Sequence, residues 1–157
     1  MAGDFLLPTM AWIKPTEQDL AGTISQREID AFRSSPSASM AADPVADTLA
    51  AATDLARGYC RSNGNLRLGP AGTIPRSLLA PVLDIAAYNI LKRLPVPVGE
   101  DRRKAFDEAM RILRDVAEGR TTPEGHGEAE DAASGTVAVQ VAVSSRRRVT
   151  SEKLEGL

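Results

Sequence analysis

The sequence has very few of the side chains that enzyme active sites and metal centres use. Its 157 residues include one cysteine, Cys60, and one histidine, His126, which stand in segments of unlike composition. This pair matches no zinc-ligand spacing, so we expect no bound metal. His126 lies between two glycines, where nothing orients its ring for proton transfer. The sequence therefore predicts that the protein is not an enzyme and has no cofactor.

Aromatic residues and long apolar runs are also scarce. Aromatics make up 4% of the chain, which favours closely packed helices over a large aromatic-lined cavity. The longest apolar stretch, residues 78–91, is interrupted by Pro81, Asp84 and Asn89, so we expect no membrane-spanning helix. Residues 1–8 lack a basic segment ahead of an apolar one, so no signal peptide is expected, and a single cysteine suits a reducing cytoplasm.

Two short helices are predicted near the beginning of the chain. Thr16 has the form of an N-cap, and Ser25 with Glu28 has the form of a capping box for a helix that reaches about residue 33. Two such helices with a tight connection can form a helix-turn-helix DNA reader. However, the arginines of the second helix are balanced by Glu28 and Asp30, whereas recognition helices usually have a basic excess. A small DNA-binding regulator is therefore the alternative interpretation.

Three longer helices should complete a small, mainly α bundle of four to five helices. The first begins at Asp43 and Pro44, the second after Pro75, and the third near residue 100. The second is the most apolar and should lie at the centre, while Cys60 should be a small core residue. The residues expected to face the core are Val45, Leu49, Ala52, Leu55, Ala56 and Tyr59 in the first, Leu83, Ile85 and Ile90 in the second, and Phe106, Ala109, Ile112, Leu113 and Val116 in the third.

The composition divides the chain into four segments. We predict an N-terminal arm (residues 1–14), a helical domain (15–118), a flexible acidic, glycine-rich linker (119–135), and a C-terminal strand with a basic docking tail (136–157). Every predicted helix has an apolar face within residues 15–118, so this part should fold without the C-terminal segments. The formal net charge of −2 gives no general attraction to nucleic acid or to anionic membranes.

The C-terminal segment contains the clearest sign of a partner. Residues 136–143 read Thr-Val-Ala-Val-Gln-Val-Ala-Val, an alternation typical of a β-strand. No upstream segment looks like its pairing partner, and a lone strand leaves unpaired backbone groups, so we expect it to pair with another chain. The arginines that follow can clamp carboxylates of that partner. The predicted partner-binding residues are Val137, Val139, Val141, Val143, Arg146, Arg147, Arg148, Leu154 and Leu157.

Seven segments carry a resemblance to a known family. They are residues 12–20, 24–32, 56–60, 74–79, 84–88, 106–119 and 148–157. In order and spacing they resemble a family of small phage head-completion proteins found in Mu-like prophages, the adaptors of the head–tail connector. The chain departs from the family pattern at residues 34–42, which lack an acidic, glycine-bearing insertion, and at Thr150, where phenylalanine is more usual.

The resemblance implies a structural role without catalysis. Such adaptors form a ring beneath the portal after genome packaging and prepare the surface for the next neck or tail protein. For this chain it implies a homo-oligomeric ring of about twelve copies, with the portal protein and the next neck or tail-completion protein as partners. Packaged DNA would pass through the ring without sequence-specific contact, and no membrane is involved. The implied location is the virion neck at the portal vertex, and the host cytoplasm during assembly. Whether the C-terminal strand pairs with a sister subunit or with the portal stays open.

Overall fold

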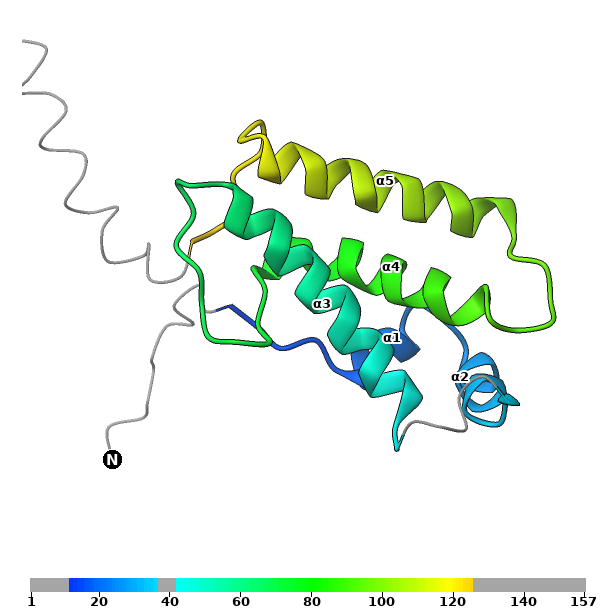
Figure 1. The fold of residues 1–157 in the computed structure, drawn as a ribbon. Helices are drawn as coiled ribbons and strands as arrows, with labels where there is room; N and C mark the ends of the chain where they lie inside the picture. The colour runs from blue at the N-terminus through cyan, green and yellow to red at the C-terminus, as the bar shows by residue number, and fades with distance from the viewer. Residues whose placement is uncertain (1–11, 37–41, 126–157) are drawn as a thin grey trace, which may run out of the picture. The chain divides into compact units, whose positions relative to one another are not determined.

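The computed structural model describes residues 12–36 and 42–125. In these residues the chain forms five α-helices: α1 (Glu17–Ala21), α2 (Gln26–Arg33), α3 (Pro44–Ser62), α4 (Leu79–Leu91) and α5 (Glu100–Ala117), with a 3-10 turn, η2 (Arg76–Leu78), directly before α4 (Figure 1). The described residues contain no strand, only an isolated antiparallel bridge between Ile13 and Ile74. The predicted mainly α bundle is confirmed, whereas the predicted strand at residues 136–143 lies outside the described residues.

The first helices begin at the predicted caps. The Thr16 hydroxyl accepts the Asp19 N–H, and the Asp19 carboxylate accepts the Thr16 N–H at 2.9 Å. Ser25 and Glu28 form the same reciprocal pair at the start of α2, and the Asp43 side chain caps α3. Helices as short as α1 and α2 do not persist alone in water. Their caps therefore fix where they begin, and packing keeps them folded.

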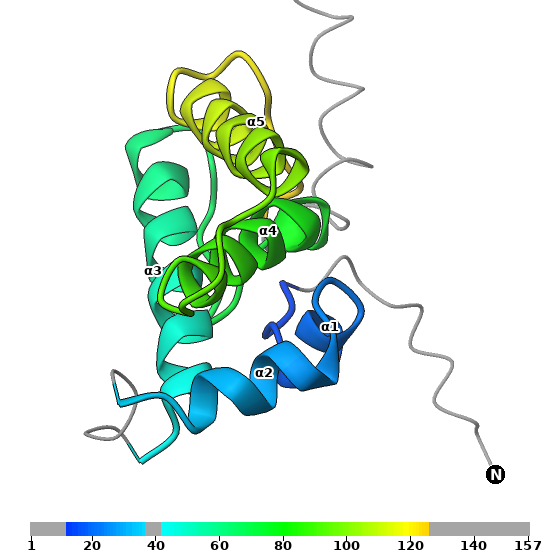
Figure 2. The ribbon, with the colours of Figure 1, turned by 90° about the vertical axis from the view of Figure 1, so that its right-hand side faces the viewer.

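Helix α4 lies at the centre and packs against every other helix (Figures 1 and 2). Helix α5 runs beside it on one side, α1 and α2 lie on the other, and α3 crosses it. Pro81 falls in the first turn of α4, where a missing N–H costs no helical hydrogen bond. The prediction of a central helix is confirmed, and Leu83, Ile85 and Ile90 are all buried.

The apolar faces of α3 and α5 are narrower than predicted. Leu55, expected in the core, is 40% exposed. Instead α3 buries Thr48 and Thr53, whose hydroxyls donate to backbone carbonyls one turn earlier, so that neither is left unpaired. Phe106 and Ile112 are only partly buried against the core. The prediction for Leu55 was wrong because apolar spacing along a helix does not show which edge its neighbours cover.

Cys60 is a core residue, as predicted. It is fully buried on α3. Burial raises the pKa of its thiol to about 11, and the nearby Arg57 offsets this only in part. The thiol is therefore neutral near pH 7 and packs as a small apolar group.

Replacing Ile85 or Ile90 with alanine should lower the free energy of unfolding by about 2–5 kcal/mol. Both side chains are almost completely buried, and alanine leaves a cavity in the helix that contacts all the others. Guanidinium denaturation followed by helical circular dichroism measures the loss. Leu55→Ala is the matched control, because a 40% exposed side chain should lose far less. Equal losses at the three positions would contradict the central place of α4.

Candidate functional site

The residues predicted to bind a partner all lie outside the described part of the chain, as does His126. This holds for the four alternating valines, for Arg146 to Arg148, and for Leu154 and Leu157. The described residues do show where the segments that carry them join the helical body. We call this place the junction. It consists of Trp12, Ile13, Arg57, residues 69–74, Ser77 and Glu124.

Trp12 joins the beginning and the end of the described chain. The residue is 5% exposed, and its Nε1–H donates to the backbone carbonyl of Glu124 at 3.0 Å. The Glu124 carboxylate accepts the backbone N–H of Ser77 at 2.8 Å. Burial opposes ionisation of Glu124, but hydrogen bonds from Ser77 and nearby backbone N–H groups outweigh it and hold the Glu124 pKa below its usual value. The chain therefore enters and leaves the helical body at one place (Figure 1).

Arg57 of α3 organises the loop at the junction. Its Nη1 donates to the carbonyls of Pro70 at 2.8 Å and Thr73 at 2.6 Å, and its Nη2 donates to the carbonyl of Gly69 at 3.1 Å. The guanidinium also lies over the Trp12 ring, 5.5 Å from its centroid. A planar group with several fixed donors suits this arrangement, whereas an ammonium group is a compact point charge. One side chain thus fixes three loop carbonyls and an indole.

Gly69 and Gly72 of this loop are each required for a different structural reason. Gly72 has a φ of +77°, a conformation that other residues rarely adopt. Gly69 is needed because a Cβ there would lie 2.9 Å from Cγ of Trp12. Beyond them, Ile74 and Ile13 exchange two backbone hydrogen bonds of 2.9 and 2.8 Å. The approach of Trp12 to Gly69 is not visible in local sequence spacing, because the two residues are far apart in the chain.

The helical body extends beyond residues 15–118 at both ends. Trp12, assigned to the N-terminal arm, is buried, and so are Pro123 and Gly125, assigned to the linker. The exit from α5 explains the second extension. Gly119 has a φ of +75°, and its N–H donates to the backbone carbonyl of Val116. The N–H of Arg120 donates to the backbone carbonyl of Asp115, and the two hydrogen bonds together form a Schellman motif. This turn directs the chain back toward Trp12.

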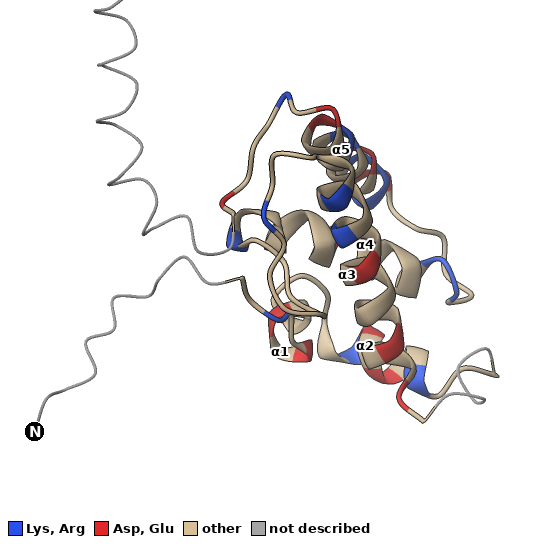
Figure 3. Cartoon of the chain, turned by 60° about the vertical axis from the view of Figure 1, so that its left-hand side comes forward, with Lys and Arg blue, Asp and Glu red and all other residues tan. Residues whose placement is uncertain are grey.

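Charged side chains of both signs are interspersed over the helical body (Figure 3). On α5, for example, Arg111 pairs with Glu108 at 2.5 Å and with Asp115 at 2.9 Å. Arg33 of α2 pairs with Glu17 at 2.6 Å. Exposed pairs of this kind contribute little to stability. Because acidic side chains stand beside the arginines, neither α2 nor α5 presents a uniformly basic surface.

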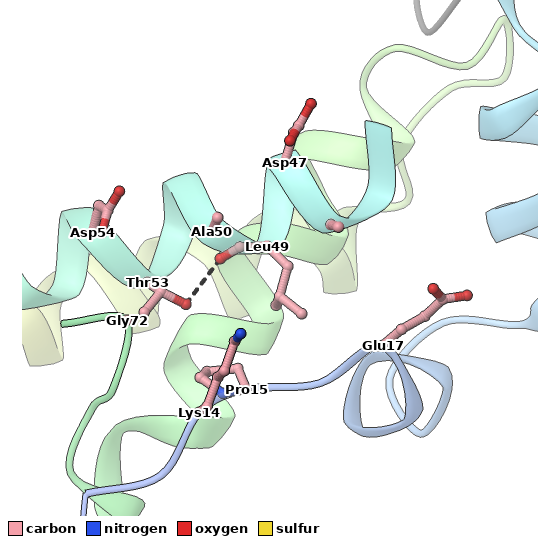
Figure 4. A pocket seen from close by; sticks show the side chains of 10 residues that line it. Lys14, Pro15, Glu17, Asp47, Leu49, Ala50, Thr53, Asp54 and Gly72 are labelled. Atoms are coloured by element: carbon pink, nitrogen blue, oxygen red, sulfur yellow. Dashed lines mark hydrogen bonds between the residues drawn. The ribbon is translucent and has the colours of Figure 1, made fainter. Parts of the chain in front are cut away.

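A hollow of about 330 Å³ adjoins the junction, and we call it the α3 hollow (Figure 4). It lies between the residues before α1, the first half of α3 and Gly72. Pro15, Leu49 and Ala50 give it apolar walls. Asp47 and Asp54 of α3 also contribute to the lining, and their carboxylates point away from Lys14 and Pro15 toward the outer rim. The full lining is Lys14, Pro15, Glu17, Ala46, Asp47, Leu49, Ala50, Thr53, Asp54 and Gly72.

A second hollow, of about 240 Å³, lies under the connection from α4 to α5. Its lining is Glu28, Leu91, Leu94, Val96, Pro97, Val98, Gly99 and Arg102. Arg102 holds the end of the connection to the body by donating to the carbonyl of Thr23. The exposed Arg93 guanidinium lies 5.9 Å from the centroid of the Phe32 ring. No local pattern in the sequence predicts these contacts, because each joins residues that are far apart in the chain.

Within residues 12–36 and 42–125, no three His, Cys, Asp or Glu side chains come together as a possible metal site. No helix of this described part is long and apolar enough to cross a membrane.

Comparison with known proteins gives one match. The family model described as Bacteriophage Mu, Gp36 matches residues 15–142, which is most of the chain. The match includes all five helices and most of the predicted C-terminal strand segment. No curated protein and no solved structure matches the chain.

Replacing Gly69 with alanine should destabilise the protein by about 1–3 kcal/mol, because the added Cβ must displace the indole of Trp12. Trp12 is the only tryptophan, so its fluorescence reports the displacement directly. Gly58→Ala is the matched control. No atom lies within 4 Å of a Cβ at that position, and alanine in a helix interior gains about 1 kcal/mol over glycine. Unchanged emission in Gly69→Ala, or equal destabilisation of both variants, would refute this packing.

A chain that ends at residue 119 should melt at a lower temperature than one that ends at residue 125, although both contain all five helices. The shorter chain lacks Glu124 and its hydrogen bonds with Trp12 and Ser77, each of which contributes about 0.5–1.5 kcal/mol. Circular dichroism measures both melting curves. If they coincide, residues 120–125 add nothing to the fold, and the boundary predicted from the sequence at residue 118 is the better one.

Proposed function

Because the chain belongs to the Bacteriophage Mu Gp36 family, we propose that it is a structural protein of the phage head–tail connector. Family membership supports a phage protein, and the connector role is the more specific part of the proposal. In this role, copies of the chain form a ring between the portal and the next neck or tail protein. The ring takes no part in catalysis, and packaged DNA passes through it without sequence-specific contact.

The junction is the observation that best supports this role. A connector subunit needs a compact body for the ring and terminal segments that contact a different neighbour. Here Trp12 and Glu124 tie the two ends of the described body together. Residues 1–11 and 126–157 therefore continue from a single place, so both segments can engage the same neighbour.

The C-terminal residues supply the attachment in this proposal. Residues 136–143 add a strand to a sheet of another chain, and the valines at 137, 139, 141 and 143 point to one side of it. Arg146 to Arg148 pair with carboxylates on that chain, and Leu154 with Leu157 provides apolar anchors. The protein acts at the portal vertex of the virion, after assembly in the host cytoplasm.

The first two helices give little support to a DNA-binding regulator. Helix α1 has five residues. Arg33, which a recognition helix could offer to a phosphate, already pairs with Glu17. Hydrogen bonds from the backbone and hydroxyl of Ser25 lower the pKa of Glu28 and keep its carboxylate charged, which repels phosphate. A regulator would also bind duplex DNA with an affinity that falls steeply as salt rises.

Changing Arg146, Arg147 and Arg148 to glutamate should weaken attachment to portal-bearing heads and leave the melting curve of the isolated protein nearly unchanged. The reversed charge repels the partner's carboxylates, while the helical body does not depend on these residues. The measurement is co-sedimentation of the purified full-length protein with DNA-filled heads that lack this protein and the tail. Electron microscopy of gold-labelled protein then shows whether it sits at one vertex.

The matched control makes the same charge change on the helical body, at the exposed residues Arg27, Arg61 and Arg103. It should bind heads as the unchanged protein does. If the C-terminal variant binds equally well at physiological salt, the three arginines have no part in attachment. If the unchanged protein does not bind heads, or binds them away from the portal vertex, the connector role is wrong.

A further inference from the structure

Two exposed features of the helical body complement each other, and we propose that they join neighbouring copies head to tail. One is the connection between α4 and α5, residues 92–99, which we call the proline loop. The other is the α3 hollow. The inference rests on the proposed ring, and it names the two surfaces through which one copy contacts the next.

The proline loop presents an apolar side chain to solvent. Val96 is 66% exposed, and Leu55 is the only other exposed large hydrophobic residue in the described part of the chain. Pro95 and Pro97 flank Val96 and restrict the backbone, and Arg102 anchors the end of the loop to Thr23. A loop that is already fixed loses little conformational freedom on binding. It is therefore suited to insert into a partner.

The α3 hollow is suited to receive an apolar group. Its volume is about 330 Å³, and Pro15, Leu49 and Ala50 line it. The one hydroxyl in its lining, that of Thr53, already donates to the carbonyl of Leu49 at 2.9 Å (Figure 4). When an apolar side chain enters the hollow, this hydroxyl keeps its hydrogen bond to Leu49. Covering it therefore leaves no unpaired donor, which is the main cost of burying a polar group.

The charges beside the two features have opposite signs. Lys92 and Arg93 precede Val96 and are exposed, while the exposed Asp47 and Asp54 stand at the edge of the hollow. Asp47 and Asp54 are two helical turns apart, roughly 10 Å along α3. This spacing can serve two separate cations, but it is too wide for one metal ion, whose oxygen ligands lie about 2–3 Å from it.

The remaining charges of the hollow do not cancel this attraction. Glu17 is already paired with Arg33 at 2.6 Å. Lys14 is the one cation in the lining, and it cannot balance both Asp47 and Asp54. An incoming pair of cations therefore meets a net negative edge.

The two features lie on different parts of the body. The proline loop connects the C-terminal end of α4 to the N-terminal end of α5 (Figure 1). The hollow lies beside the first half of α3 and residues 14–17 (Figure 4). One copy therefore uses its loop on a second copy and leaves its own hollow free for a third. Such a head-to-tail contact closes into a ring when the rotation between copies allows it.

The test reverses the charges on each surface of the full-length protein and then on both. The hollow variant is Asp47→Lys with Asp54→Lys, and the loop variant is Lys92→Glu with Arg93→Glu. Each should weaken self-association at least tenfold in sedimentation velocity. The combined four-residue variant should regain most of it, because the reversed loop again meets a hollow of opposite charge. Val96→Asp should weaken association without changing the melting temperature, since Val96 is exposed.

Asp101→Lys with Asp107→Lys is the matched control, because both residues are exposed acids on α5. It should associate as the unchanged protein does. The inference is overturned if the combined variant does not regain association, or if the control loses as much association as the hollow and loop variants. It is also overturned if the protein without substitutions is a monomer in the absence of heads. If that monomer still binds the portal vertex, the connector role stands without this contact. Self-association through these surfaces without binding to heads would support the contact and reject the connector role.

Discussion

The arrangement of this protein around its junction depends on the guanidinium of Arg57. It satisfies the carbonyls of Gly69, Pro70 and Thr73 and lies over the Trp12 ring. The Pro70 carbonyl also accepts hydrogen bonds from the N–H and the hydroxyl of Thr73. The half-buried carbonyls of Gly69 and Thr73 depend more on Arg57, and unpaired backbone groups are costly when water is excluded. Because the loop is held, Ile74 can pair with Ile13. The segment after Ile13 then forms one wall of the α3 hollow.

The bundle shows how a chain with few aromatic residues builds a core. Helix α4 is apolar on most sides and is surrounded by the other helices. Small residues such as Ala52, Ala56, Ala86 and Ala109 are buried where helices approach each other. The stacked rings of Tyr88 and Phe106, 4.3 Å apart, close one edge between α4 and α5.

The junction and the two hollows suggest how the proposed tasks are divided over the molecule. The junction holds the places where the terminal segments join the body, so contacts with the portal or neck would be made from there. In the proposal, contacts with sister copies use the proline loop, which lies away from the junction, and the α3 hollow, which adjoins the junction at Gly72. These two surfaces belong to the helical body, so a ring could form without occupying the terminal segments that attach it.

The sequence by itself determined the helices, their starting points and the central place of α4. The capping pairs Thr16 with Asp19 and Ser25 with Glu28 are three residues apart, and apolar periodicity is also a local property, so both can be recognised in the printed chain. Family membership was likewise visible in the order of its motifs, while the partner-binding roles of residues 136–157 stay predictions. Only the tertiary structure decided that Trp12 is buried, that residues 119–125 pack back on the body, and that Leu55 is exposed. Trp12 and Glu124 are 112 positions apart, and no local pattern records which distant surface a side chain will meet.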